Sequence, residues 1–217
     1  MFLVLCMGIH AENQIRRTNT LAVDAVDLLV NENLVVSISM NNSDDITGLQ
    51  FDISYPTVYK PYNNNYSLTT RTKGMTVTLR AIDDYTLRYF CYFMSNGGIN
   101  AGDGKVLTLF FKIASTSGNV PEGTYNISVK NIKMSASDLT NKYTGTNLSC
   151  SFKTWKSSSV KKGDANGDGK VNNKDVDATV SYIMTGNKKG FYFLNADMNT
   201  DKQINAADIV RIVKIIR

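Results

Sequence analysis

The sequence predicts a mainly β protein that ends in a small α-helical unit. Apolar and polar residues alternate with a period of two over residues 20–152, as in half-buried strands. After residue 163, a twelve-residue acidic loop occurs twice, each time followed by apolar residues at helical spacing. The chain has 217 residues, 42% hydrophobic and 20% charged, which fits one domain of about 150 residues plus a small one.

Two stretches show the strand pattern most clearly, residues 34–41 and 49–54. Turn-forming residues separate the strands at Asn96-Gly97-Gly98, Gly102-Asp103-Gly104 and Pro121-Glu122-Gly123. About nine strands fit between Thr20 and Phe152. Regular spacing without amphipathic helices predicts an antiparallel β-sandwich whose two inner faces form one core.

The two acidic loops start 33 residues apart and carry oxygen-bearing side chains at the same positions. Positions 1, 3, 5, 9 and 12 supply carboxylate or amide oxygens, and position 7 supplies a backbone carbonyl. Calcium takes six to eight hard oxygen donors at about 2.3–2.6 Å, which a tightly turning loop can direct to one point. The sequence therefore predicts two calcium sites. Their ligands are Asp164, Asn166, Asp168, Lys170, Asn172 and Asp175, then Asp197, Asn199, Asp201, Gln203, Asn205 and Asp208.

Each loop is followed, but not preceded, by an apolar helical pattern, and the first pattern closes at Gly186. Such duplicated half EF-hands over residues 163–217 resemble the dockerin module of cellulosomal and related bacterial proteins. The resemblance implies two bound calcium ions and a cohesin-type protein partner. In dockerins, loop positions 10 and 11 take part in recognition. Here they are Asn173 and Lys174 in the first half, and Ala206 and Ala207 in the second.

Lys202 departs from the loop pattern because it occupies position 6 of the second loop, where a sharp turn favours glycine. A lysine with positive φ there would cost about 1 kcal/mol. We therefore expect the second site to be weaker or slightly reshaped.

Residues 18–155 resemble the cohesin family, whose jelly-roll sandwich is shared with certain carbohydrate-binding modules. The likeness lies in residues 46–56, 107–113 and 121–125, and it assigns no partner-binding residue. The serine- and lysine-rich residues 156–162 are expected to form a flexible linker.

Sugar binding is an alternative for the sandwich, because Tyr55, Tyr59, Tyr62 and Tyr66 crowd a stretch that also holds residues 63–65, all asparagine. The same tyrosines could instead pack over a loop and cap the sandwich. A glycosidase would need two carboxylates about 5–10 Å apart across a cleft. The adjacent pairs Asp83-Asp84 and Asp44-Asp45 point to opposite faces if extended, so we expect no catalytic activity.

The first residues predict export. Residues 2–9 form an apolar run too short to span a bilayer, which is typical of a signal peptide ending near residue 11. Cys6 could alternatively anchor a lipid, although Leu5 before it is bulky for such a site. Processing would remove His10, the only histidine, and with it imidazole chemistry. It would leave Cys91 and Cys150, which could pair or stay as thiols.

The net charge is +5 with a pI near 9.0, but the basic residues are scattered, which argues against nucleic-acid binding. We expect a secreted or cell-surface bacterial adaptor without enzymatic activity, which docks through its dockerin into an extracellular polysaccharide-processing assembly. Its sandwich would bind another dockerin or, alternatively, a polysaccharide. A third possibility is closure of the sandwich onto the chain's own dockerin.

Overall fold

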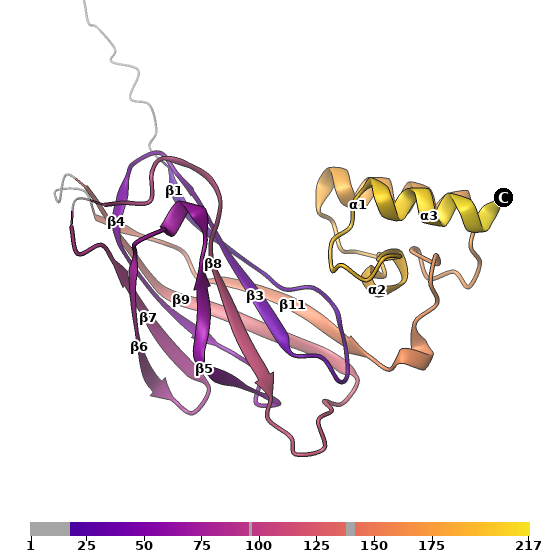
Figure 1. Ribbon diagram of the computed structural model, residues 1–217, viewed down its shortest axis with the longest axis horizontal. Helices are drawn as coiled ribbons and strands as arrows, with labels where there is room; N and C mark the ends of the chain where they lie inside the picture. The colour runs from indigo at the N-terminus through magenta and orange to yellow at the C-terminus, as the bar shows by residue number, and fades with distance from the viewer. Residues whose placement is uncertain (1–17, 96, 138–141) are drawn as a thin grey trace, which may run out of the picture.

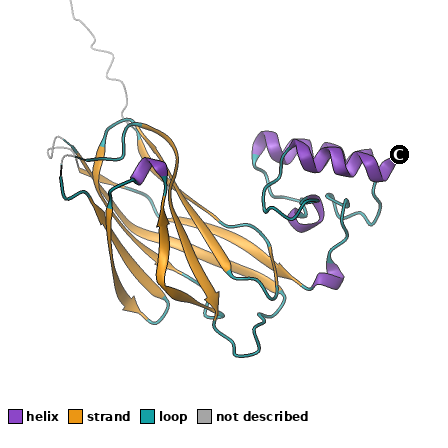
Figure 2. Cartoon of the chain, in the orientation of Figure 1, coloured by secondary structure: helices purple, strands orange, loops and turns teal. Residues whose placement is uncertain are grey.

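In the computed structural model, which describes residues 18–95, 97–137 and 142–217, a β-sandwich is joined to a small helical module (Figure 1). The predicted leader, residues 1–11, lies outside the described residues, as do Cys6, His10 and Asn96. Figure 2 separates the strands of the sandwich from the helices of the C-terminal module.

The smaller sheet of the sandwich has four strands in the order β1-β3-β8-β5, and all neighbours are antiparallel. Its strands are β1 (Asn19–Asp24), β3 (Leu34–Asn42), β8 (Gly102–Ile113) and β5 (Tyr59–Leu68). A short 3-10 turn, Thr70–Thr72, follows β5.

The larger sheet has the order β2-β11-β9-β4-β7-β6, and β10 also pairs with β9. Its neighbours are antiparallel except for the parallel pair β2 and β11. The described residues thus hold eleven strands rather than about nine, and the short β2 and β10 account for the difference. The strands are β2 (Leu28–Leu29), β4 (Ile46–Ser54), β6 (Thr76–Asp83), β7 (Thr86–Tyr92), β9 (Gly123–Ala136), β10 (Lys142–Thr144) and β11 (Leu148–Trp155).

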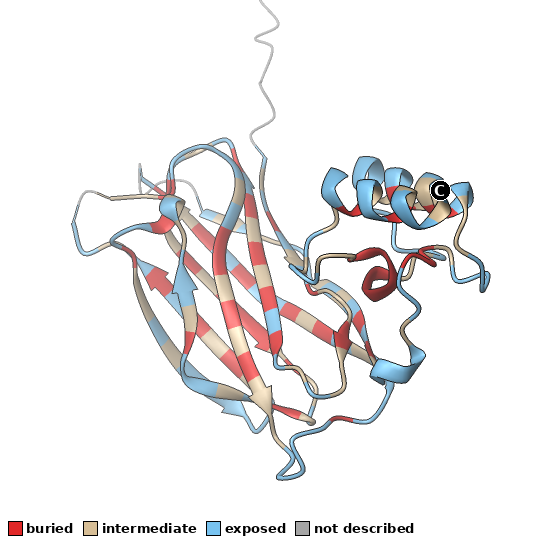
Figure 3. Cartoon of the chain, turned by 45° about the vertical axis from the view of Figure 1, so that its right-hand side comes forward, coloured by how far each residue is buried: buried red, intermediate tan, exposed pale blue. Residues whose placement is uncertain are grey.

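The core lies between the two sheets, as the alternation of residues predicts. Along β3, Val36, Ile38 and Met40 are buried while the residues between them are more exposed (Figure 3). Aromatic rings fill the space between the sheets, and Phe51 stacks on Tyr89 with 5.0 Å between ring centroids. Burying large apolar side chains contributes about 1.5–3 kcal/mol each, so this core supplies the main stabilisation of the sandwich.

The predicted turn at Gly102-Asp103-Gly104 is wrong, because β8 begins at Gly102. Gly102 and Gly104 have φ of 144° and 134°, which side chains rarely adopt. The guanidinium of Arg71 lies over them and donates hydrogen bonds to the carbonyls of Gly102, Gly104 and Met40 at 2.9–3.2 Å. The glycines therefore serve a close side-chain approach within a strand.

Asp52 is buried on the outer side of β4, where the alternation predicts an exposed residue. Arg88 of β7 covers it and donates two hydrogen bonds, at 2.6 and 2.8 Å, to its carboxylate. Asn131 donates a third at 2.6 Å from a β9 position with φ 52°. These bonds, led by that from Arg88, lower the pKa of Asp52 despite its burial.

The tyrosines and cysteines of the sandwich differ in their burial. Tyr55 and Tyr59 are buried in the core, whereas Tyr62 is 39% exposed. Cys91 and Cys150 are free thiols. Burial raises the pKa of Cys91 to about 12 and that of Cys150 to about 11.

The C-terminal module contains α1 (Asn173–Thr185), α2 (Phe193–Ala196) and α3 (Ala206–Ile216). Helices α1 and α3 lie side by side, with the short α2 against α3 (Figure 1). The first helix ends where the sequence predicts, with Gly186 in the left-handed conformation. No described helix has both the length and the apolar character needed to cross a bilayer.

Candidate metal centre

The first loop is built around the carboxylate of Asp164, its first residue. Asp164 is buried, and its Oδ2 accepts a hydrogen bond from the backbone N–H of Gly169 at 3.0 Å. Its Oδ1 is buried as well, without any hydrogen-bond partner. A buried carboxylate oxygen without a donor is costly, and its environment therefore suits a cation.

The second loop repeats this arrangement at Asp197. Its Oδ2 accepts a hydrogen bond from the N–H of Lys202 at 3.0 Å, and its buried Oδ1 has no partner. Among the described residues, these two Oδ1 atoms are the buried side-chain oxygens and nitrogens without a hydrogen bond. Both stand at position 1 of the duplicated loop, so the feature belongs to the repeat.

Positions 3 and 5 form successive turns in which a side-chain oxygen accepts the N–H two residues ahead. Asn166 Oδ1 accepts from Asp168, and Asp168 Oδ1 accepts from Lys170, at 2.8 and 2.9 Å. Asn199 and Asp201 repeat these bonds at 3.3 and 2.8 Å. Each accepting oxygen has a second lone pair that a cation can use.

Positions 9 and 12 also start the helices, which explains why each loop leads directly into one. Asn172 caps α1 by accepting the N–H of Lys174 at 2.9 Å, and Asp175 accepts the N–H of Asn172 at 2.8 Å. Asn205 and Asp208 form the same capping box at α3. Asp175 and Asp208 are fully buried.

The predicted ligands of each loop are mixed: three carboxylates, two amide oxygens and one carbonyl. In the described part of the chain, no three Asp, Glu, His or Cys side chains gather as a metal site. The loop carboxylates instead accept backbone N–H groups, as at Asp168 and Asp175. All-oxygen donors fit calcium or magnesium rather than the softer transition metals.

The two loops adopt the same left-handed conformations at positions 4 and 6 with different residues. Gly167 and Gly169 have φ of 73° and 84° in the first loop. The second loop has Thr200 and Lys202 there, at 61° and 62°. The predicted strain at Lys202 is thus present, but sequence reasoning missed the equivalent strain at Thr200.

Asn195, which sequence reasoning also missed, ties the two halves together. Its Nδ2 donates to the carbonyl of Asp164 at 2.8 Å, and its Oδ1 accepts the N–H of Lys161 at 3.0 Å. Its own carbonyl accepts the N–H of Gly163 at 2.8 Å. Asn195 lies just before the second loop and does not fit the metal-ligand spacing. The sequence therefore contains no signal for this role.

The predicted recognition residues are exposed at the starts of the two long helices. Asn173 and Lys174 lie at α1, and Ala206 and Ala207 lie at α3. Exposed apolar side chains continue along both helices, at Val180, Ile183, Met184, Val210 and Ile215.

Another side of the module contacts the sandwich. Lys188 Nζ pairs with Asp24 at 2.7 Å, and Lys202 Nζ pairs with Glu32 at 2.9 Å. The rings of Trp155 and Tyr192 meet across the junction, with 5.8 Å between centroids. The predicted linker, residues 156–162, contains a 3-10 turn at Ser157–Ser159.

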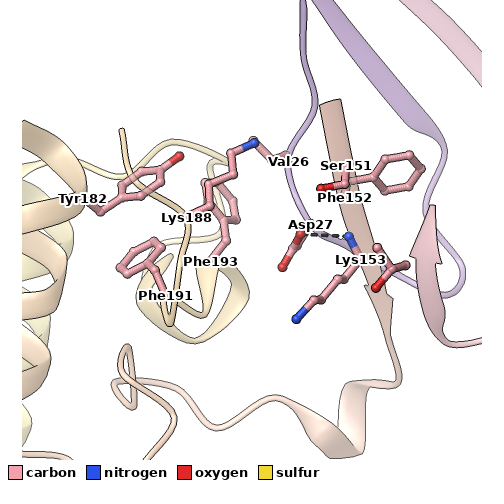
Figure 4. A pocket seen from close by; sticks show the side chains of 10 residues that line it. Val26, Asp27, Ser151, Phe152, Lys153, Tyr182, Lys188, Phe191 and Phe193 are labelled. Atoms are coloured by element: carbon pink, nitrogen blue, oxygen red, sulfur yellow. Dashed lines mark hydrogen bonds between the residues drawn. The ribbon is translucent and has the colours of Figure 1, made fainter. Parts of the chain in front are cut away.

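A cavity of about 130 Å³ lies between the two units. In Figure 4, Tyr182, Phe191 and Phe193 line it from the module, and Asp27 and Lys153 line it from the sandwich. The recognition residues of α1 and α3 do not line this cavity.

Comparison with known proteins identifies the C-terminal module. Residues 162–217 match the family model of the dockerin type I domain, which confirms the resemblance seen in the sequence. No curated protein matches the chain.

The sandwich is similar in fold to solved cohesins, as the sequence predicts. A non-cellulosomal cohesin from the archaeon Archaeoglobus fulgidus has a TM-score of 0.52 at 14% identity, covering 64% of this chain and 91% of that chain. The cohesin module of a family 33 glycoside hydrolase from Clostridium perfringens has a TM-score of 0.53 at 9% identity, covering 64% and 98%. A type I cohesin–dockerin complex from Clostridium thermocellum has a TM-score of 0.50 at 13% identity, covering 63% and 100%.

These identities establish the fold of the sandwich alone. The chain therefore joins a dockerin type I domain to a sandwich of the cohesin fold.

Proposed function

We propose that the chain is a calcium-dependent docking protein whose C-terminal module binds a cohesin-type domain. The observation that carries this proposal is the pair of buried, unpartnered Oδ1 atoms of Asp164 and Asp197, at the first ligand position of both loops. A bound divalent cation would neutralise the buried carboxylates and complete the polar contacts that the chain leaves open.

Each ion would be held by side-chain oxygens from positions 1, 3, 5, 9 and 12 and by the position-7 carbonyl of Lys170 or Gln203. Position 9, Asn172 or Asn205, would act through a water molecule, as the ninth position of such calcium loops often does. The ion would supply charge neutralisation and cross-linking of the loop.

The partner-binding surface would comprise the exposed starts of α1 and α3 with the apolar side chains that follow them. Asn173 and Lys174 are polar, whereas their counterparts Ala206 and Ala207 are apolar. Two related halves with different chemistry should offer one preferred orientation to a partner. Contact with the sandwich leaves this surface exposed, which supports binding between molecules rather than closure within one chain.

Calcium titration of the full chain by isothermal calorimetry tests the metal proposal, with magnesium as the competing ion. Two binding events are expected, and Asp164→Ala and Asp197→Ala should each remove one. Asp177→Ala, at an exposed carboxylate of α1 outside the loops, is the matched control and should remove neither. Unchanged binding in both loop variants would contradict the assignment.

Exchange of the two recognition pairs tests the orientation. A variant with alanines at 173 and 174 and with Asn and Lys at 206 and 207 should bind the same cohesin through its opposite half. The bound half can be identified by crosslinking. An unchanged bound half would count against a role for these four residues.

The sandwich would act as a second protein-binding unit, which makes the chain an adaptor without catalytic activity in an extracellular polysaccharide-processing assembly of a bacterium. The outer face of the larger sheet supports this role, because it exposes Phe90 and Tyr92 on β7. A hollow beside them is also lined by Gln50 and Lys133. Exposed aromatics on a flat sheet surface are typical of protein interfaces.

Polysaccharide binding is a second candidate, favoured by an open groove of about 520 Å³ on the smaller sheet. Tyr62, Asn63 and Asn64 line it where β5 departs from its register with β8. Tyr62 is held in place by a hydrogen bond of 2.8 Å from Asn33 and by Lys112, whose Nζ lies 5.7 Å from the ring centroid. A fixed aromatic ring beside amides offers stacking and hydrogen bonds to a sugar.

Two variants distinguish these roles, because their aromatic residues lie on different sheets. Phe90→Ala should weaken binding of dockerins to the full chain and leave glycan binding unchanged. Tyr62→Ala should weaken binding to a glycan array and leave dockerin binding unchanged. If neither ligand binds the wild-type chain, both roles of the sandwich are excluded.

A further inference from the structure

We propose that a residue of the sandwich supports the second metal loop: Glu32 positions that loop by holding Lys202, so that calcium binding at the second site and the Glu32–Lys202 ion pair reinforce each other. This inference rests on the proposed function, because it requires calcium in the second loop. It adds a positioning residue that lies outside the metal-binding repeat.

Lys202 joins the metal loop to the sandwich through its two ends. Its backbone N–H donates to Asp197 Oδ2 at 3.0 Å, and its Nζ pairs with Glu32 Oε1 at 2.9 Å. Between these contacts, its backbone has φ of 62°, which disfavours any residue with a Cβ. The lysine therefore orients a ligand and bears the strain at the same position.

The Glu32 carboxylate is held in place by its own turn, independently of Lys202. Its second carboxylate oxygen accepts the N–H of Leu29 at 2.8 Å, and its own N–H donates to the carbonyl of Leu29 at 3.0 Å. The neighbouring Val30 N–H donates to the carbonyl of Trp155, the last residue of β11. The carboxylate thus projects from a turn that is anchored to the larger sheet, and little side-chain freedom is lost when the ion pair forms.

A second cavity, of about 290 Å³, lies where this turn faces the loop. Leu29 and Glu32 line it from the sandwich, and Asp197, Thr200 and Lys202 line it from the loop. The first loop makes no equivalent contact: position 6 there is Gly169, which has no side chain to reach the sandwich. The coupling is therefore specific to the second site.

Thermodynamic linkage makes the effect reciprocal. Each ion-pair partner is about a third exposed, with side-chain exposures of 38% and 28%. Breaking such a pair should change an equilibrium by about two- to five-fold. Loss of the pair should weaken the calcium affinity of the second loop by up to that factor, and calcium should strengthen the Glu32–Lys202 ion pair equally.

The test is calcium titration of full-length chains in which one site remains. Asp164→Ala leaves the second loop, and Asp197→Ala leaves the first. In the first background, Glu32→Gln should weaken calcium affinity about two- to five-fold, whereas in the second it should have no effect. Asp24→Asn is the matched control, because it removes the other ion pair between the units, away from the metal loops.

Lys202→Gly completes a double-mutant cycle. This substitution removes both the strain at position 202 and the ion pair. Glu32→Gln should therefore have no effect on calcium affinity in that background. Lys202→Met removes the other partner of the ion pair and provides the same test should Glu32→Gln fail to fold. It should also weaken the calcium affinity of the second loop.

Three results would overturn the inference: equal affinities for Glu32→Gln and wild type, equal losses for Glu32→Gln and Asp24→Asn, or a Glu32→Gln effect that persists beside Lys202→Gly. A wild-type chain that binds no calcium would instead refute the proposed function itself.

Discussion

The sandwich and the C-terminal module are stabilised in different ways. The sandwich buries a continuous apolar core that includes Phe51, Tyr89 and Phe111. At the centre of the module, buried carboxylates take the place of such a core, with Asp164, Asp175, Asp197 and Asp208 all nearly or fully inaccessible. Its buried apolar side chains are few: Ala165, Phe193, Leu194, Ala196 and Ile212.

This difference shows why the same chain should respond to calcium in one part only. A module of about 55 residues buries too little apolar surface to be comfortably stable alone, and bound metal commonly makes up the deficit. The sandwich, with its continuous apolar core, does not depend on a bound metal for its stability. Substitutions in either region test whether the two units have separate sources of stability.

Phe51→Ala should have the largest effect. Removing a fully buried ring that stacks on Tyr89 should lower the free energy of unfolding of the sandwich by about 3–5 kcal/mol. Urea denaturation followed by tyrosine fluorescence measures the loss, and calcium affinity of the folded chain should be unchanged. A parallel fall in calcium affinity would show that the two units do not have separate sources of stability.

Asp164→Ala should destabilise the module by a smaller amount. At a free calcium concentration 100-fold above the dissociation constant, one ion contributes about 2.7 kcal/mol. Thermal unfolding followed by far-ultraviolet circular dichroism should show a lower helix transition and an unchanged strand transition. If the variant and wild type melt alike in calcium, the first loop does not contribute to stability through a metal ion.

Asp52→Asn should reduce the stability of the sandwich by about 1–2 kcal/mol, because its hydrogen bonds with Arg88 lose their ionic character. The pKa of Asp52 is lower in the folded state than in the unfolded state. Its contribution is therefore complete above the unfolded pKa of about 4 and is lost as pH falls through the lower, folded value.

Wild-type stability should consequently fall more steeply than that of the variant below pH 4. Urea midpoints between pH 2 and pH 7 measure this difference. Identical slopes would mean that the Arg88 pair does not act through the charge of Asp52.

Thr200→Gly should have the smallest effect and should strengthen the second loop. Thr200 has φ of 61°, at the position that Gly167 occupies in the first loop. Relief of that conformation is worth about 1 kcal/mol, or about five-fold in calcium affinity. Calcium titration of Thr200→Gly in the Asp164→Ala background, where only the second site remains, measures this gain. An unchanged affinity would show that the strain at Thr200 does not limit the second site.

The sequence predicted the features that depend on local spacing. Alternation along β3 identified its buried face, and the repeated loop pattern located the capped starts of α1 and α3. The positive φ at Lys202 also followed from its loop position. These features were accessible because each is determined within a few residues of the chain.

The features that were missed depend on distant partners. Asp52 is buried because Arg88, on a neighbouring strand, covers it. Asn195 orders the module through contacts with residues about 30 positions earlier, and Lys202 pairs with Glu32 of the sandwich. A periodic pattern contains no information about such pairs. The domain boundaries and metal ligands assigned from the sequence remain predictions.

Hydrogen exchange of backbone amides, with calcium and after its removal by EDTA, measures whether calcium stabilises the C-terminal module. If calcium holds the module together, amides of α1 and α3 should lose their protection in EDTA while those of β3, β4 and β9 keep theirs. Equal protection of α1 and α3 in both conditions would contradict the claim that metal binding stabilises this module.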